Sequence, residues 1–385
     1  MTTPEWPSEL GPVICVVGAR PNFMKMAPIL RAFAANVPAI PSLLIHTGQH
    51  YDKDMNDKLF ADLRLPRPDI NLEVGSGSHA VQTAEVMRRF EPVVDNHRPS
   101  CVLVVGDVNS TLACTLVAVK KGVPVVHVEA GLRSYDRRMP EEINRVLTDQ
   151  VADLLYTTER SAEANLLREG IDTERVSFVG NVMIDSLLHN LEFARPPAGA
   201  IEAAGFNPAV IASPSGYGVV TLHRPSNVDN REHLVQLLGV LSEISHQLPL
   251  IFAMHPRTRA NIERFGLMNL LENPRLIVLP PQGYLEMVGL MAGARIVLTD
   301  SGGLQEEAPA LHKPVLVMRE VTERPEALEA GTVRLVGSAK DSIVQGVLEL
   351  LSDAELYARM SSAPNPYGDG RAALRICGIL QEKYK

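Results

Sequence analysis

The sequence predicts an α/β protein built from two doubly wound parallel sheets. Short apolar runs alternate with longer helical stretches, and the runs are continuously apolar, as is typical of strands covered on both faces. The alternation occurs twice, separated by a stretch rich in Pro, Gly, Ala and Ser between about Asn190 and Gly218. Since the chain has 385 residues, it is long enough for two such domains.

Each domain is expected to contain its own series of strands. In the first series the strands cover residues 13–17, 42–46, 101–105, 123–128, 154–158 and 176–180, with helical segments such as 55–63 and 79–97 between them. The second series covers residues 218–222, 249–254, 276–280, 295–299 and 314–318. We expect an N-terminal Rossmann-like domain over residues 1–189, onto which a last helix within residues 366–385 packs back, and a C-terminal Rossmann-like domain over residues 190–365.

Composition excludes several classes of protein. The net charge is −8 and no block of Lys or Arg occurs, which argues against a nucleic-acid partner. No apolar run approaches the ~20 residues needed to cross a bilayer, and the polar N-terminus lacks the regions of a signal peptide, so we expect a soluble, cytoplasmic protein. Cys15, Cys101, Cys114 and Cys377 are widely spaced, which predicts reduced packing residues rather than disulfides or a metal site.

No nicotinamide cofactor is expected. The dinucleotide fingerprint GxGxxG is absent, and the first strand-to-helix turn reads GARPNFMK, with Arg20 where a second glycine would admit a pyrophosphate. No His, Asp or Glu set has clear metal-ligand spacing.

The segment DSGGLQEEA, from Asp300 to Ala308, follows an expected strand directly. Two glycines follow a serine, and a helix-forming tail begins with Glu306 and Glu307. Paired glycines let backbone N–H groups approach an anion, and a helix presents its positive end there, while a carboxylate can accept hydrogen bonds from sugar hydroxyls. The pattern suggests a site for a nucleotide diphosphate, although a plain turn with carboxylates against the helix dipole would read the same way.

Charged side chains follow the strands of the first domain. Arg20 and Lys25 come after strand 13–17, Asp107 after strand 101–105, and Glu129 after strand 123–128. Clustered acids raise one another's pKa, so these carboxylates suggest proton transfer. A helix cap at Asp107 and an ordinary exposed turn at Arg20 are the alternatives.

A third acid, Glu141, precedes Arg145 by four residues, on one face of a helix that begins near Pro140. This acid is a further candidate for proton transfer, whereas a surface ion pair is the alternative.

In the second domain, His and Arg residues follow two strands. His223 and Arg224 come after strand 218–222, and His255, Arg257 and Arg259 after strand 249–254. Beside the 300–308 segment they suggest a wall that faces an anion. Arg324 and Glu326 follow strand 314–318.

Taken together, the motifs resemble the non-hydrolysing UDP-N-acetylglucosamine 2-epimerases over nearly the whole chain. The matching segments, in order, are GARP, HTGQH, GDVNSTLA, HVEAGLR, MPEEINR, GNVMID, LHRP, DSGGLQEEAP, TERPEA and NPYGDG. The resemblance implies a glycosyltransferase-B-like fold, a homodimer, and an active site in the interdomain cleft that uses no cofactor. It also implies a reaction in which UDP leaves by anti elimination and re-adds after inversion at carbon 2 of the sugar.

The resemblance also implies roles for residues of this chain. Asp107, Glu129 and Glu141 are the catalytic acids, with His223 as the catalytic histidine near the diphosphate. The substrate-binding residues are then Arg20, Lys25, Arg145 and Arg324 as cations, Ser301 and Gly302 at the phosphates, and Glu307 at the ribose; His255, from the expected wall, joins them.

The sequence departs from the family at two places. Asn22 replaces a glutamate of the bacterial prototypes. Gln49 and His50 of a second, allosteric nucleotide site are present, but Tyr51, Asp52 and the segment SHAVQTAEV differ from it, which disfavours substrate activation.

The segments HTGQHYD and RRMPEEINRVLTDQ also resemble the branch that acts on UDP-2,3-diacetamido-glucuronate. That substrate is the alternative. A glycosyltransferase and a catalytically silent UDP-sugar sensor are competing functions.

Overall fold

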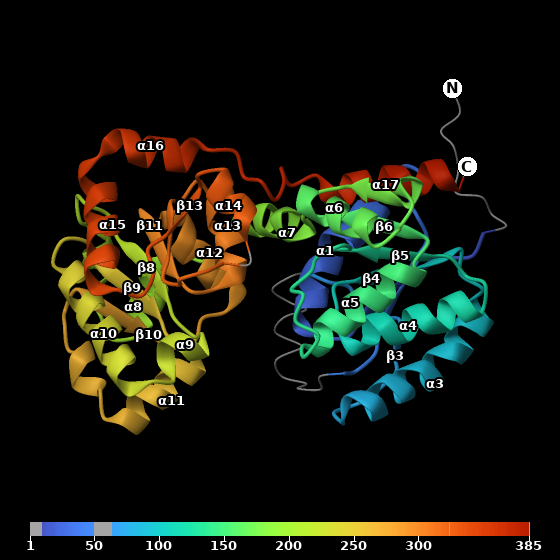
Figure 1. Cartoon of the computed structure of the whole chain (residues 1–385), viewed down its shortest axis with the longest axis horizontal. Coiled ribbons are helices and arrows are strands. Elements are labelled where there is room, and N and C mark those ends of the chain that lie inside the picture. Colours follow the sequence, from blue (N-terminus) through green and yellow to red (C-terminus); the bar gives the residue numbers. More distant parts are fainter. Residues whose placement is uncertain (1–9, 50–63, 323, 385) are drawn as a thin grey trace. The chain divides into compact units, whose positions relative to one another are not determined.

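The computed structural model describes residues 10–49, 64–322 and 324–384 (Figure 1). The chain divides into two compact units: unit 1 comprises Met1–Ser186 and Tyr367–Lys385, and unit 2 comprises Leu187–Pro366. Each unit holds one parallel sheet with helices around it, so the predicted α/β class with two doubly wound sheets is confirmed.

Unit 1 contains a seven-stranded sheet in the order β3-β2-β1-β4-β5-β6-β7. Its strands are β1 (Val13–Val17), β2 (Ser42–His46), β3 (Ile70–Asn71), β4 (Cys101–Val105), β5 (Val125–Val128), β6 (Leu154–Thr157) and β7 (Val176–Phe178). Its helices are α1 (Arg20–Ala35), α3 (His79–His97), α4 (Asn109–Lys120), α5 (Pro140–Val151), α6 (Arg160–Arg168) and α17 (Ala372–Lys383), and α7 (Val182–Leu191) begins in this unit. Figure 1 shows α17, from the end of the chain, beside α1, and the two helices are in contact.

Unit 2 contains a six-stranded parallel sheet in the order β10-β9-β8-β11-β12-β13. Its strands are β8 (Gly218–Thr221), β9 (Leu250–Ala253), β10 (Leu276–Leu279), β11 (Ile296–Thr299), β12 (Val315–Val317) and β13 (Val333–Leu335). Its helices are α8 (Pro197–Ala203), α9 (Pro225–Val228), α10 (Arg231–Ser245), α11 (Pro256–Phe265), α12 (Tyr284–Gly293), α13 (Gly302–Ala310), α14 (Pro325–Glu329), α15 (Lys340–Ser352) and α16 (Ala354–Ser362).

The strands predicted from apolar runs are all present, because strands covered on both faces need continuous apolar sequence. The short strands β3 and β13 carried no comparable signal, and the predicted helix over residues 55–63 lies outside the described residues. All four cysteines are buried and free. The glycines of the 300–308 segment do not precede a helix but form its first turn, since α13 begins at Gly302.

The sheet orders identify where each unit can bind a ligand. The strand order reverses between β1 and β4 in unit 1 and between β8 and β11 in unit 2. Loops that leave the carboxyl ends of these strands diverge, which opens a crevice at that edge of the sheet. The loops concerned carry Asp107, His223 and Ser301, and the helix that follows β1 carries Lys25; all four are predicted site residues.

Candidate active site

In unit 1, Asn22 joins the loops that follow β1 and β4. Its Oδ1 accepts hydrogen bonds from the N–H groups of Gly18 (3.2 Å) and Ala19 (3.0 Å), and its Nδ2 donates to the carbonyl of Val105 (3.0 Å). A glutamate at this position could not donate this last bond when ionised. Asn22 is therefore a structural clamp between the two loops.

Lys25 and Glu129 form an ion pair at this edge of the sheet. Their closest atoms, Nζ and Oε2, are 2.6 Å apart, and the two side chains are only 14% and 13% exposed. Glu129 adopts a φ of +75°, a conformation that is strained for a residue with a Cβ. The turn keeps this conformation because the N–H groups of Glu129 and Ala130 both donate to the carbonyl of Tyr156, at 3.0 and 3.1 Å.

Asp107, directly after Gly106 at the end of β4, forms an ion pair with Arg145 of α5. The other side of the Arg145 guanidinium contacts Glu142 at 2.7 Å. Glu142 also accepts hydrogen bonds from the N–H groups of Ser134 and Tyr135, both at 2.9 Å. Burial acts to raise the pKa of Glu142, but these hydrogen bonds outweigh it and hold the pKa below its ordinary value.

The predicted acid Glu141 has a different environment from its neighbour Glu142. Its side chain is partly exposed, and within the described residues it forms no ion pair. The ion-pair partner of Arg145 on α5 is three residues away, at Glu142, rather than four residues away, at Glu141. Arg20 opens α1, and its side chain lies outside what the structure describes.

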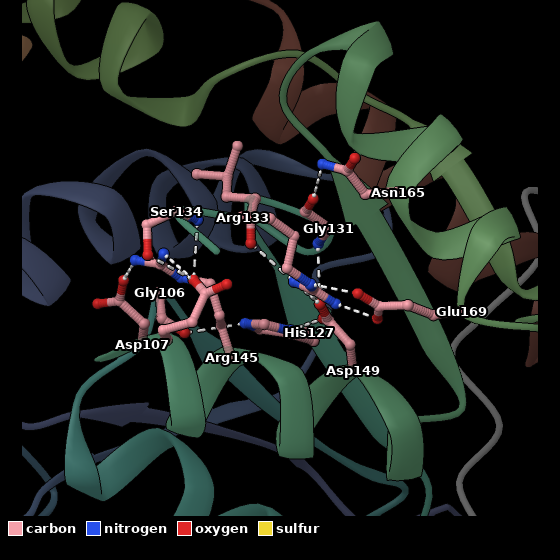
Figure 2. A network of polar contacts seen from close by, with 12 residues as sticks. Gly106, Asp107, His127, Gly131, Arg133, Ser134, Arg145, Asp149, Asn165 and Glu169 are labelled. Carbon is pink, nitrogen blue, oxygen red and sulfur yellow. Dashed lines mark hydrogen bonds and ion pairs between the residues drawn. The ribbon is translucent and has the colours of Figure 1, made fainter. Parts of the chain in front are cut away.

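A buried polar network lies next to Gly106 and Gly131, the glycines beside the Asp107 and Glu129 positions in the chain (Figure 2). His127 is fully buried, with Nδ1 2.6 Å from Asp149 Oδ1 and Nε2 2.9 Å from the carbonyl oxygen of Gly106. Asp149 also contacts Arg133 (2.7 Å), which in turn pairs with Glu169 (2.6 Å). Asp149 was not predicted as a site residue, and neither was Glu142, because their roles come from contacts with segments distant in the chain.

In unit 2, Asp300 organises the loop after β8. The buried carboxylate accepts hydrogen bonds from the backbone N–H groups of His223 (3.0 Å) and Arg224 (2.9 Å) and from Asn227 Nδ2 (3.0 Å). Its Oδ1 is 2.9 Å from His223 Nδ1, which leaves Nε2 of that ring for a ligand. Burial acts to raise the pKa of Asp300, but these hydrogen bonds hold it below its ordinary value.

The N-terminus of α13 lies next to the loop after β8 and has the features of an anion-binding site. Ser301 is its N-cap residue and donates its own N–H to Thr299 Oγ1 (2.9 Å). The first N–H groups of a helix have no partner within the helix and carry its positive end. A Cβ built on Gly302 would lie 3.8 Å from Arg224 Nη2, so a guanidinium accompanies this terminus.

Further along α13, Glu306 and Glu307 are both buried. Glu306 forms an ion pair with Arg324, whereas Glu307 is 3.5 Å from the hydroxyl of Tyr284. Burial raises the pKa of Glu307 to about 8, and the neighbouring Glu306 acts in the same direction. A ligand that donated hydrogen bonds to Glu307 would stabilise the charged form that burial disfavours.

The predicted wall of His and Arg residues is only partly present. His255 lies beside His223, with ring centroids 5.3 Å apart, and its Nδ1 accepts a hydrogen bond from the N–H of Arg257 (3.1 Å). Desolvation and His223 lower the pKa of His255. Arg257 and Arg259, however, pair with the surface carboxylates Asp229 and Glu263.

The described residues contain neither a metal-binding group of side chains nor a helix suited to a membrane. Among them no three His, Cys, Asp or Glu side chains are grouped as a metal site. In the same part of the chain, no helix combines the length and apolar character that crossing a membrane requires.

Comparison with known proteins identifies the family. The model of a family described as UDP-N-acetylglucosamine 2-epimerase matches residues 34–381. A UDP-N-acetylglucosamine 2-epimerase from Methanocaldococcus jannaschii is 41% identical over 368 residues, covering 95% of this chain and 97% of the relative. A UDP-2,3-diacetamido-2,3-dideoxy-D-glucuronate 2-epimerase from Pseudomonas aeruginosa is 39% identical over 371 residues, covering 96% and 99%.

Solved structures agree with the sequence relatives. Two structures of the UDP-GlcNAc 2-epimerase from Methanocaldococcus jannaschii match with TM-scores of 0.85 and 0.74, at 38% and 39% identity, each covering 96% of this chain and 99% of that chain. The second of them is a complex with UDP-GlcNAc and UDP.

Fold and relatives together define a glycosyltransferase-B-like enzyme of the isomerase class. The chain belongs to the UDP-N-acetylglucosamine 2-epimerase family. The predicted family and fold are confirmed, while the expected position of the active site between the domains stays a prediction.

Proposed function

We propose that the protein is a non-hydrolysing UDP-N-acetylglucosamine 2-epimerase, which interconverts UDP-GlcNAc and UDP-ManNAc. A base removes the proton on carbon 2 while the bond from carbon 1 to the UDP oxygen breaks, and UDP departs with the bonding electrons. Protonation of the resulting alkene from the opposite face and re-addition of UDP give the epimer. Both relatives reported above at about 40% identity are named as UDP-sugar 2-epimerases, which supports this chemistry.

The observation that carries the proposal is the pair of carboxylates at the switch point of unit 1. Asp107 and Glu129 leave neighbouring strands, β4 and β5, and each is held by a cation from another element, Arg145 or Lys25. Proton abstraction and delivery at one carbon need two groups with fixed positions. Glu141, partly exposed near the start of α5, is the third proposed acid, and acid and base are not assigned among the three.

Unit 2 is proposed to hold the leaving group. Ser301 and Gly302 would bind the diphosphate at the positive end of α13, with Arg224 supplying a guanidinium. His223, oriented by Asp300, would stabilise the charge that develops on the departing phosphate oxygen.

The remaining proposed contacts complete the site. Glu307 would bind the ribose hydroxyls. Arg324, which forms an ion pair with the neighbouring Glu306, is proposed as a substrate-binding cation. Arg20, Lys25, Arg145 and His255 are proposed as further substrate contacts.

Proton NMR of the purified protein in deuterated water tests the proposal. With UDP-GlcNAc, the manno epimer should form and carry deuterium at carbon 2. Unlabelled epimer would overturn the elimination mechanism, and consumption of substrate only with an added acceptor would favour a glycosyltransferase. Asp107→Asn should abolish turnover, whereas the same change at Asp95, an exposed residue paired with Lys121, should leave it unchanged.

The same experiment with UDP-2,3-diacetamido-glucuronate tests the alternative substrate. The similar identity to the Pseudomonas aeruginosa relative supports trying it. The substrate with the larger kcat/KM identifies the sugar.

We also propose a cytoplasmic homodimer. Met139, the N-cap residue of α5, and Ile143 and Leu147 within this helix are spaced four residues apart and are 40–46% exposed, which would suit a protein contact. Light scattering would measure the mass, and the four buried free thiols are compatible with a reducing compartment.

A further inference from the structure

The loops that carry Asp107 and Glu129 share a support that the reaction itself does not use. His127 is the third residue of β5 and is fully buried, so no substrate reaches it. Both of its ring nitrogens are nevertheless within hydrogen-bond distance of an acceptor. Both nitrogens of this buried ring are therefore satisfied by protein groups rather than by a ligand.

The partners of His127 determine its charge. The Gly106 carbonyl, 2.9 Å from Nε2, can only accept a hydrogen bond, so Nε2 donates. Asp149 already receives donors from Arg133 (2.7 Å) and from the Gly131 N–H (3.0 Å), which fixes it as a carboxylate. Nδ1 therefore donates as well, at 2.6 Å, and the ring is an imidazolium.

The electrostatic surroundings agree with this assignment. Burial acts to lower the pKa of His127, but Asp149 outweighs it and the net shift is upward, with the Gly106 carbonyl and Glu129 acting in the same direction. Asp149 keeps a lowered pKa despite its burial, because His127 and Arg133 face it.

The geometry ties both catalytic loops to this pair (Figure 2). His127 donates a hydrogen bond to the carbonyl of Gly106, which has a φ of +67°. Gly106 directly precedes Asp107. Asp149 holds the N–H of Gly131, two residues after the strained Glu129. A shift of either partner would therefore move one of the two carboxylates.

We propose that His127, held as a buried imidazolium by Asp149, is a positioning residue that fixes the Asp107 and Glu129 carboxylates relative to each other. The inference rests on the proposed function, since it concerns the two acids of that reaction. A displacement of a catalytic group by about 1 Å can reduce turnover ~100-fold, and loss of a supporting contact commonly costs ~10- to 100-fold.

His127→Gln tests the inference, with His46→Gln as a matched control. His46 ends β2 of the same sheet, is also buried, and its Nε2 has no hydrogen-bond partner among the described residues. We expect kcat of His127→Gln to fall ~10- to 100-fold with KM for UDP-GlcNAc within about twofold, and His46→Gln to change neither. A kcat within twofold of wild type in folded His127→Gln, or an equal loss in His46→Gln, would overturn the proposal.

Asp149→Asn provides a second variant in case His127→Gln does not fold. Because both changes disrupt the same His127–Asp149 pair, the kcat of the double variant should be no lower than that of the slower single variant. A loss of kcat equal to the product of the two single losses would contradict the coupling.

NMR of nitrogen-15-labelled histidine tests the charge without any turnover. One imidazolium with two slowly exchanging ring protons should persist at pH 8 in wild type and be absent in Asp149→Asn. Its absence in wild type would refute the inference even if the enzyme epimerises. Its presence in a protein that does not epimerise would instead refute the proposed function.

Discussion

Glu307 allows the sharpest test of unit 2, because its burial should destabilise the fold in a pH-dependent way. Burial raises the pKa of this carboxyl from 4.5 to about 8, so the folded state binds its proton more tightly than the unfolded state does. Its contribution to stability is therefore full below pH 4.5, decreases as the pH rises towards 8, and is constant above that. At about 1.4 kcal/mol per pH unit, the loss is about 3 kcal/mol at pH 7 and reaches about 5 kcal/mol above pH 8.

Glu307→Gln removes the titration and should raise the free energy of unfolding by these amounts at pH 7 and above, with little effect at pH 4. Calorimetric scans of both proteins from pH 4.5 to pH 9 would measure this, and the transition that UDP shifts in wild type should be that of unit 2 if the proposed site is right. Glu306→Gln is the control, since the same change one residue away breaks the ion pair with Arg324 and should lower stability. A Glu307→Gln variant less stable than wild type at pH 8, or a difference independent of pH, would refute the reasoning.

Three further substitutions test individual contacts. Lys25→Met should lower kcat about 100-fold, measured by NMR of epimer formation, because it leaves Glu129 partly buried without its cation; an unchanged kcat would count against the pair. Gly106→Ala should reduce the free energy of unfolding by about 1 kcal/mol in urea titrations, because the φ of Gly106 is +67°. It should also lower kcat, because the new Cβ would lie 3.3 Å from Lys25 Nζ. Unchanged stability would contradict the left-handed conformation of Gly106. Arg224→Met should raise the Kd for UDP about tenfold in calorimetric titrations, because its guanidinium accompanies the α13 terminus, and an unchanged Kd would exclude it from the phosphate site.

The sequence predicted the fold well because parallel strands covered on both faces leave a signal in a single apolar run. The positions of Asp107 and Glu129 at one edge of the sheet were predictable for the same reason, since each residue comes shortly after such a run and parallel strands end at one edge. The motif after β11 also identified Ser301 and Gly302 at a helix terminus.

Contacts that depend on distant segments were not predictable. Glu141 and Glu142 are equally plausible partners of Arg145 by helix spacing, and the Ser134–Tyr135 turn, which donates to Glu142, decides between them. Arg257 likewise has the same local pattern as Arg224, but Asp229 lies within its reach. Local sequence does not show which acceptor each of these guanidinium groups contacts.

The arrangement of charge in unit 1 explains why a buried network can support the site without competing with it. His127 and Arg133 contribute two positive charges, and Asp149 and Glu169 two negative charges, so the network is neutral as a whole. It can therefore order the Gly106 and Gly131 backbone without adding net charge near the Lys25–Glu129 and Arg145–Asp107 pairs. Asp107 and Glu129 follow neighbouring strands, so the backbone of the two loops determines how far apart their carboxylates lie. If these carboxylates are the acid and base of the reaction, the rigidity of the two loops is as important as the acids they carry.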